Sequence, residues 1–179
     1  MKTKLFLLSV AVMGLATSCQ QQPESQPLAD EVQYVDPFIG TGFHGHTFPG
    51  ATRPYAMVQL SPDTHIMGWD ASSGYHYDDQ QIYGFSHTHL SGTGIGDLGD
   101  ILLLPFSGGD SIKAVATFKK ETEKATPGYY AVQLENLGVN VELTSTDRVG
   151  FHRYTFDNPK DRRVMLDLGH VLQPNWGHK

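Results

Sequence analysis

Alternation of apolar and polar residues dominates the second half of the chain. The period-two segments are residues 128–135, 139–146, 149–157 and 162–168. In the first of them, Tyr130, Val132 and Leu134 share one face. Successive side chains of a strand point to opposite faces, so this period predicts strands with one buried face. Short polar breaks, such as the turn expected at 136–138, indicate an antiparallel β-sandwich.

The first half has fewer regular strands and more loop. Two apolar runs, 55–60 and 101–106, predict buried strands. Between them lies a long stretch rich in Gly, Asp, His, Ser and aromatic residues. Long loops of this kind in compact domains usually carry function. The charged run 119–124 has no apolar stripe and predicts a solvated strand end or a turn, so the expected fold class is all-β.

The N-terminus has the pattern of an export signal. Lys2 and Lys4 precede the apolar run 5–16, which is shorter than the roughly 20 residues of a membrane-spanning helix. We therefore predict a secretory signal peptide over residues 1–18. Small residues come directly before Cys19, an arrangement that resembles a bacterial lipobox, where the cysteine is acylated. The alternative for Cys19 is a free thiol buried in a core.

The composition of the mature chain indicates its domain boundaries and excludes one class of partner. Residues 19–31 are polar and contain proline, which predicts a flexible, lipid-anchored tether, and leaves residues 32–179 for the folded domain. With a single cysteine, no intramolecular disulfide is formed. The net charge of -6 argues against a nucleic-acid partner. We expect an exported protein, anchored in the bacterial cell envelope at the periplasm or the outer membrane.

A GxGxxG match at residues 94–99 does not predict a dinucleotide site. Such a site needs a strand before the glycines and a helix after them, whereas a strand pattern follows here at 101–106.

Two histidine pairs are the most conspicuous polar motifs. His44 with His46, and His87 with His89, are spaced so that both members of a pair point to one side of an extended chain. Zinc would need three or four converging ligands, and no known metal-ligand signature is present. One alternative is a metal hydrolase built on these pairs. The other, which we favour, is that the imidazoles form hydrogen bonds with loop backbone or with a polar ligand. We therefore predict no metal site in this chain.

The segment 68–77 combines Trp69 with hydroxyl and carboxylate side chains. Sugars present apolar faces ringed by hydroxyls, which suit an aromatic ring beside polar groups. A tryptophan that pins the loop to the core is the equal alternative. The aspartates at 78–79 and 97–100 lack the spacing of a calcium loop, and no pair of catalytic carboxylates can be chosen by spacing.

An ordered set of motifs closely resembles the N-terminal region of glycoside hydrolase family 92. The motifs are YVDPFIGTG at 34–42, HGHTFPGA at 44–51, MVQLSPDT at 57–64, GYHY at 74–77, YGFSHTHLSGTG at 83–94 and ATPGYY at 125–130. The likeness continues to about residue 169 and covers nearly all of the mature chain.

The resemblance implies a calcium-dependent exo-α-mannosidase that acts on mannose-containing glycans with inversion. It also implies an N-terminal β-sandwich followed by a catalytic (α/α) barrel that holds the general acid, the general base and the main calcium ligands. The sequence stops at Lys179 before any barrel, so we expect a sandwich truncated at its C-terminal end and no catalytic residue in this chain.

A sugar-facing role for the sandwich loops follows from the same resemblance. Trp69 is similar to a family tryptophan that borders the mannose subsites, and Asp70, His87 and His89 are weaker candidates for substrate binding. The loop 44–48 is equally suited to pack on the barrel. A free-standing lipoprotein that binds glycans without cleaving them is the alternative function.

Overall fold

The structure is a computed structural model that describes residues 30–92, 94–108 and 115–176. The predicted signal peptide and Cys19 lie outside these residues. The chain divides into two units, Met1–Val32 and Gln33–Lys179, and the strands and the site described below lie in the second. No helix among the described residues is long and apolar enough to cross a membrane.

The described residues form an all-β antiparallel fold, which confirms the predicted class. The strands are β1 (Ala51–Thr52), β2 (Gln59–Asp63), β3 (Gln81–Ile82), β4 (Gly84–Ser86), β5 (Leu102–Phe106), β6 (Ala116–Thr117), β7 (Lys124–Thr126), β8 (Tyr129–Leu134), β9 (Val139–Ser145), β10 (Gly150–Phe156) and β11 (Arg163–Asp167). Short 3-10 helices are η2 (Asp30–Tyr34), η3 (Trp69–Ser73), η4 (Lys120–Thr122) and η5 (Pro174–Trp176).

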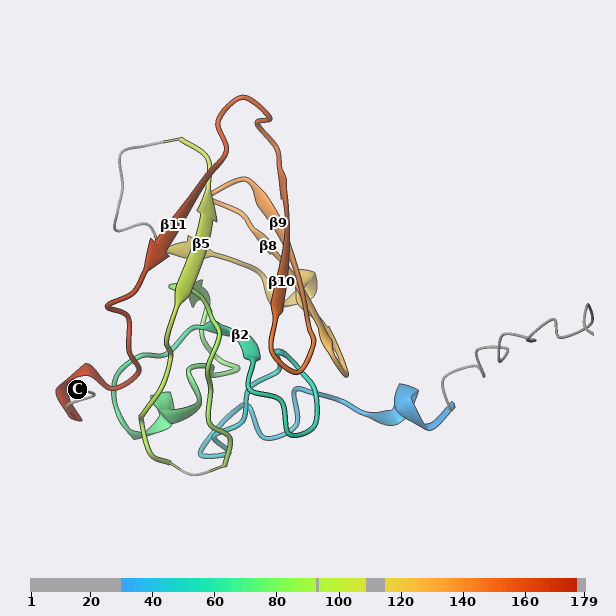
Figure 1. The fold of residues 1–179 in the computed structure, drawn as a ribbon, viewed down its shortest axis with the longest axis vertical. Helices are drawn as coiled ribbons and strands as arrows, with labels where there is room; N and C mark the ends of the chain where they lie inside the picture. Colours follow the sequence, from blue (N-terminus) through green and yellow to red (C-terminus); the bar gives the residue numbers. More distant parts are fainter. Residues whose placement is uncertain (1–29, 93, 109–114, 177–179) are drawn as a thin grey trace, which may run out of the picture. The chain divides into compact units, whose positions relative to one another are not determined.

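Two main sheets enclose the core. One has the order β1-β2-β4-β5-β11, the other β10-β9-β8-β7, and β3 pairs with β6 in a small third sheet. Figure 1 shows β5 beside β11 in one layer and β8, β9 and β10 in the other. Leu60, Phe85 and Leu104 of the first sheet pack in one buried cluster with Tyr130 and Val141 of the second. The alternating strands therefore bury one face each, as the period-two pattern predicts.

The strand predicted at 55–60 is wrong in its first part. Tyr55 has a left-handed backbone with φ 61° and is fully exposed, and Met57 is also exposed. The strand, β2, begins only at Gln59 and runs on to Asp63. A non-glycine residue in the left-handed region cannot continue a strand, so the chain turns here first. The charged run 119–124, predicted as a solvated strand end or a turn, forms η4 at Lys120–Thr122 and reaches the first residue of β7, but the carboxylate of Glu123 is buried.

The long connections between the strands of the first sheet gather below the strands in Figure 1, where the C-terminal segment also ends. They include the segment before β1, the loop that contains η3, and the loop between β4 and β5. The buried carboxylate of Glu123 helps to fix this region, because it accepts hydrogen bonds from the hydroxyls of Tyr75 and Tyr130 and from Lys120.

Candidate functional site

Trp69 and Asp70 open η3 and lie at the surface beside an aromatic loop. The side chain of Trp69 is 52% exposed. Its ring centroid lies 4.5 Å from that of His46, nearly perpendicular at 81°, and 5.0 Å from that of His44. Phe43 is 80% exposed and extends the aromatic surface, 4.1 Å from the ring of His44. These five residues are called the platform below.

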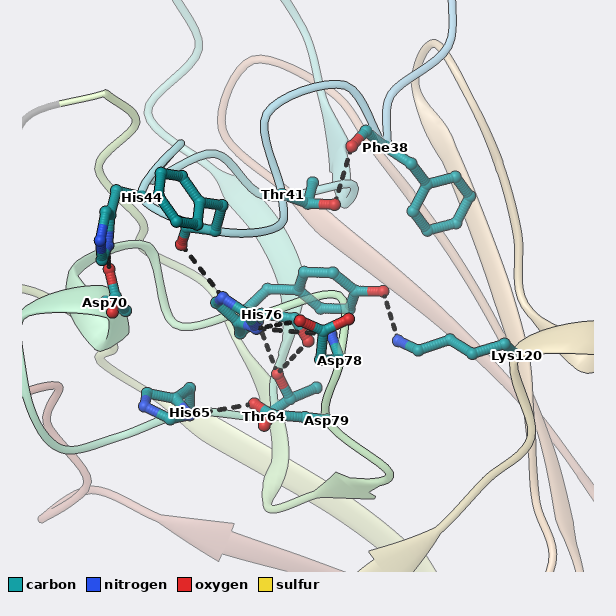
Figure 2. Close-up of polar contacts among 12 residues, drawn as sticks. Phe38, Thr41, His44, Thr64, His65, Asp70, His76, Asp78, Asp79 and Lys120 are labelled. Atoms are coloured by element: carbon teal, nitrogen blue, oxygen red, sulfur yellow. Dashed lines mark hydrogen bonds and ion pairs between the residues drawn. The ribbon is translucent and has the colours of Figure 1, made fainter.

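Asp70 joins the two histidines of the platform. Its Oδ1 lies 2.7 Å from Nδ1 of His44 (Figure 2). The same oxygen lies 3.2 Å from Nε2 of His46. The hydrogen bond from His44 is the main reason that the pKa of Asp70 lies below its ordinary value. Partial desolvation opposes this shift, and the bond from His46 adds to it. Asp70 is therefore ionised at neutral pH and places a negative charge beside the indole.

The loop that contributes the two histidines is fixed by its own backbone. Phe43 and His46 both have φ 52°, in the left-handed region. The carbonyl of Phe43 accepts a bond from Nε2 of His76 at 3.1 Å (Figure 2), and that of His46 accepts one from the amide of Gly92 at 2.5 Å. Such bonds hold the two strained residues, so the imidazoles are presented in a defined orientation.

Gly74 allows η3 to pack closely against the buried interior. It ends the helix in the left-handed conformation, with φ 75°, and donates its amide to the carbonyl of Ala71 at 2.9 Å. Its carbonyl accepts a bond from the amide of Thr64 at 2.7 Å. A Cβ atom at this position would lie 2.4 Å from Oδ1 of Asp63, so only glycine allows this close approach.

Directly beneath Gly74, Asp63 bridges two imidazoles. Its Oδ1 lies 2.6 Å from Nε2 of His89, and its Oδ2 lies 2.8 Å from Nε2 of His170. Nδ1 of His89 lies 2.7 Å from the carbonyl oxygen of Gln59, so both nitrogens of this ring face oxygen atoms. Burial alone would raise the pKa of Asp63, but the charge of His89 and the hydrogen bonds from both histidines outweigh it and lower the pKa.

His89 lies beneath the surface: its side chain is fully buried. Here it supports the segment that carries Trp69 and Asp70, and its predicted contact with a sugar stays a prediction.

His87 belongs to a different cluster, between the sheets. Its Nδ1 donates to the carbonyl of Ile101 at 2.7 Å, and its Nε2 lies 3.1 Å from Nε2 of His152. Nδ1 of His152 in turn accepts the hydroxyl of Tyr154 at 2.7 Å. This chain of bonds gives each of the two imidazoles a partner at Nε2 and at Nδ1. The ring nitrogens of His87 are thus engaged away from Trp69, and its predicted role in substrate binding also stays a prediction.

Metal-binding groups are not seen in the part of the chain that the structure describes: no three His, Cys, Asp or Glu side chains there are arranged to hold an ion. The donors around Asp70 are mainly imidazole nitrogens, whereas calcium takes six to eight oxygen ligands. The platform therefore does not fit calcium.

The structure brings together Trp69 and Asp70 of the predicted site and joins to them the pair His44 and His46. The local spacing of two histidines signalled that pair. The roles of Asp63 and His170 had no sequence signal, because these residues are 107 positions apart.

Comparisons with known proteins agree with this fold. The glycosyl hydrolase family 92 N-terminal domain matches residues 34–178. A protein of Arthroderma benhamiae described as an uncharacterised secreted glycosidase is 32% identical over 176 residues, which cover 89% of this chain and 22% of that protein.

Solved structures of the same family are similar as well. An α-mannosidase of family GH92 from Bacteroides thetaiotaomicron, solved in complex with mannoimidazole, is 40% identical with a TM-score of 0.77, over 79% of this chain and 20% of that one. An inverting mannosidase of the family from the same organism is 30% identical with a TM-score of 0.68, over 80% and 20% of the two chains. The chain thus spans about a fifth of the length of these relatives. It belongs to glycosyl hydrolase family 92, of which it contains the N-terminal domain.

Proposed function

We propose that this domain supplies one wall of the sugar pocket of an exo-acting α-mannosidase. The observation that carries the proposal is the half-exposed indole of Trp69 beside the ionised carboxylate of Asp70. An aromatic face next to charged and hydrogen-bonding groups suits a sugar, which presents an apolar C–H face and a rim of hydroxyls.

In this proposal, different groups of the platform bind different parts of the sugar. The indole of Trp69 packs on the apolar face of a mannose ring. Both imidazole bonds go to Oδ1 of Asp70, so Oδ2 has lone pairs with which to accept a sugar hydroxyl. His44, whose side chain is 47% exposed, presents a ring edge to the same space. His46 lies beneath and fixes the carboxylate and the indole, and we propose that His89 acts likewise from below through Asp63.

Chemistry in the complete enzyme needs groups that we do not assign to this chain. Inverting glycosidases use a carboxylic acid to protonate the leaving oxygen and a carboxylate to activate water on the opposite face of the sugar. One relative is an inverting mannosidase, and we propose inversion for the whole enzyme. We expect the 179-residue chain by itself to bind mannosides without cleaving them. Because its relatives include glycosidases, we favour this role over that of a free-standing glycan-binding lipoprotein.

Calcium, which the family resemblance implies, belongs in this proposal to the complete enzyme. The nitrogen-rich surroundings of Asp70 do not suit it, so its ligands would lie mainly outside this chain. Sugar binding by the platform is accordingly expected to persist when calcium is removed with a chelator.

Export and lipid anchoring are part of the proposal as well. The basic start, the apolar run and the small residues before Cys19 support a lipid-modified N-terminus. Metabolic labelling with palmitate tests it: the label should enter the chain and be absent from a Cys19→Ala variant. A variant that still takes up palmitate would contradict the anchor.

Calorimetry of the full chain with α-linked mannobiose tests the sugar-binding function. We expect saturable binding at about millimolar sugar, as an open surface with few contacts allows. Cellobiose, a β-linked glucose disaccharide of the same size, should bind much more weakly. No heat with mannobiose, or equal heat with both sugars, would overturn the proposal.

A further inference from the structure

The segment 170–173, which follows the last strand, lies between the two loops that border Trp69. On one side, the amide of Gln173 donates to the carbonyl of Ile66 at 3.0 Å, and its side-chain amide donates to the carbonyl of Gly68. On the other side, the amide of Leu172 donates to the carbonyl of Leu98 at 2.9 Å. One short segment therefore joins the start of η3 to the loop that precedes β5.

Gln173 occupies its place with almost no freedom. It is 3% exposed and has φ 56°, a conformation that side-chain-bearing residues rarely adopt. A Cβ atom at Gly96 would lie only 1.6 Å from Cγ of Gln173. In the same loop, a Cβ atom at Gly94 would lie 2.5 Å from Nε1 of Trp69. The glycines of the GxGxxG match thus make room for both Gln173 and the indole.

A second anchor ties the same segment to the interior below η3. Nε2 of His170 lies 2.8 Å from Oδ2 of Asp63, whose other oxygen contacts the imidazole of His89. The carboxylate of Asp63 also lies directly against Gly74, at the end of η3. The segment 170–173 therefore holds both ends of η3: Gln173 bonds Gly68 at its start, and His170 bonds Asp63, which lies against Gly74 at its end.

We propose that the segment 170–173 is a strap that sets the position of the platform, with Gln173 as the positioning residue. Gly68 precedes Trp69 directly, so the bond from Gln173 fixes the backbone at the point where the indole is attached. The strap controls how much of the indole a sugar reaches and hence the affinity for mannosides. The part that concerns sugar affinity rests on the proposed function, whereas the position of Trp69 does not.

Fluorescence of Trp69 tests the strap without any sugar. The chain has two tryptophans, so a Trp176→Phe background leaves Trp69 as the only indole. In this background, Gln173→Gly removes the side-chain donor and suits the positive φ, which favours a folded product. Gln173→Glu keeps the length of the side chain and replaces the donor by an acceptor. Gln133→Glu, at an exposed position of β8, is the matched control.

Loss of the strap bond should free the indole. We expect acrylamide quenching of Trp69 to rise about twofold in both Gln173 variants, and the dissociation constant for α-linked mannobiose to rise about fivefold to tenfold, as for loss of one buried hydrogen bond. The Gln133 control should change neither. Circular dichroism identifies the variants that are folded.

The outcomes separate the two proposals. If quenching rises in the Gln173 variants but the parent chain binds no mannobiose, the strap is supported and the proposed function fails. If a folded Gln173 variant matches the parent in quenching, the strap is overturned, whether or not the parent binds mannobiose.

Discussion

Asp63 Oδ1 lies 2.6 Å from Nε2 of His89, and neither side chain reaches solvent. This pair, extended by His170, is the base on which the segment with Trp69 and Asp70 rests. The exposed platform is thus built on a buried charge cluster, and a binding surface supported in this way keeps its geometry before any ligand arrives.

Asp63→Asn should destabilise the domain strongly. The variant removes the negative charge and leaves two imidazoles around a neutral amide in a site closed to water. Breaking a buried pair by removing one partner costs about 3–5 kcal/mol, and we expect a loss of unfolding free energy in that range by urea denaturation. Asp147→Asn, at an exposed ion pair with Arg53, is the control and should change stability by less than about 1 kcal/mol. Equal effects of the two substitutions would remove the special role of Asp63.

Gly74→Ala and Gly128→Ala form a matched pair. Both glycines have a left-handed backbone, with φ 75° and 77°. A Cβ atom at Gly74 meets Asp63, whereas one at Gly128 meets nothing within 4 Å. Gly128→Ala should therefore lower the unfolding free energy only by the strain of a left-handed alanine backbone, about 1–2 kcal/mol. Gly74→Ala should lower it by more, because the new Cβ atom also displaces Asp63. Chemical denaturation measures both, and equal losses would show that Asp63 does not support η3 through this contact.

Acid should weaken the sandwich through His152. Burial, with a smaller contribution from the neighbouring His87, lowers the pKa of His152 from 6.5 to about 4. Between pH 6.5 and 4 the unfolded chain binds a proton that the folded chain does not, so the unfolding free energy falls as the pH falls through this window. The slope from one such group is at most about 1.4 kcal/mol per pH unit.

Substitution can isolate this contribution. His152→Asn should flatten the pH dependence of stability between pH 6.5 and 4, while His65→Asn, at a more exposed ring, should leave it in place. Asp63 has its pKa lowered from 3.8, so its contribution is present above pH 3.8 and is lost only as the pH falls through the lowered value. An unchanged slope in His152→Asn would refute the assignment.

Asp70→Asn should weaken sugar binding with little effect on stability. The change keeps the shape of the side chain but removes the charge that accepts bonds from His44 and a sugar hydroxyl. We expect the dissociation constant for α-linked mannobiose to rise about tenfold, because bonds to charged groups are the stronger ones. Asp78→Asn, at a highly exposed carboxylate, is the control, and the affinity of that variant should match that of the parent chain. Parent-like affinity in Asp70→Asn would exclude Asp70 from the site.

The strands β8 and β9 of the second sheet could be predicted closely from sequence. Alternation over residues 128–135 corresponds to β8 at Tyr129–Leu134, and the next segment corresponds to β9 at Val139–Ser145. Both are antiparallel strands with one buried face, so their alternation of apolar and polar residues is visible in the local sequence. The apolar run at 55–60 was less informative, because a continuous run has no period that fixes where a strand starts. The left-handed backbone of Tyr55, which delays β2, leaves no trace in that run.

The site was predictable only in its local parts. Sequence placed Trp69 and Asp70 together because they are neighbours, and it left open whether the indole binds a sugar or pins a loop. In the structure the indole is half exposed and also packs on His46. The supports of the platform join residues far apart in sequence, such as Asp63 with His170 and Gly68 with Gln173. Such pairs form only through tertiary packing, so no spacing rule could identify them.

Calorimetry of Trp69→Ala against Phe151→Ala tests the central claim most directly. Both side chains are 52% exposed in the parent, but Phe151 lies on β10, outside the platform. If the platform is the sugar-binding wall, Trp69→Ala loses measurable binding of α-linked mannobiose, while Phe151→Ala binds it like the parent. If both variants bind like the parent, or if both lose binding equally, Trp69 is not the residue that holds the sugar and the account is wrong.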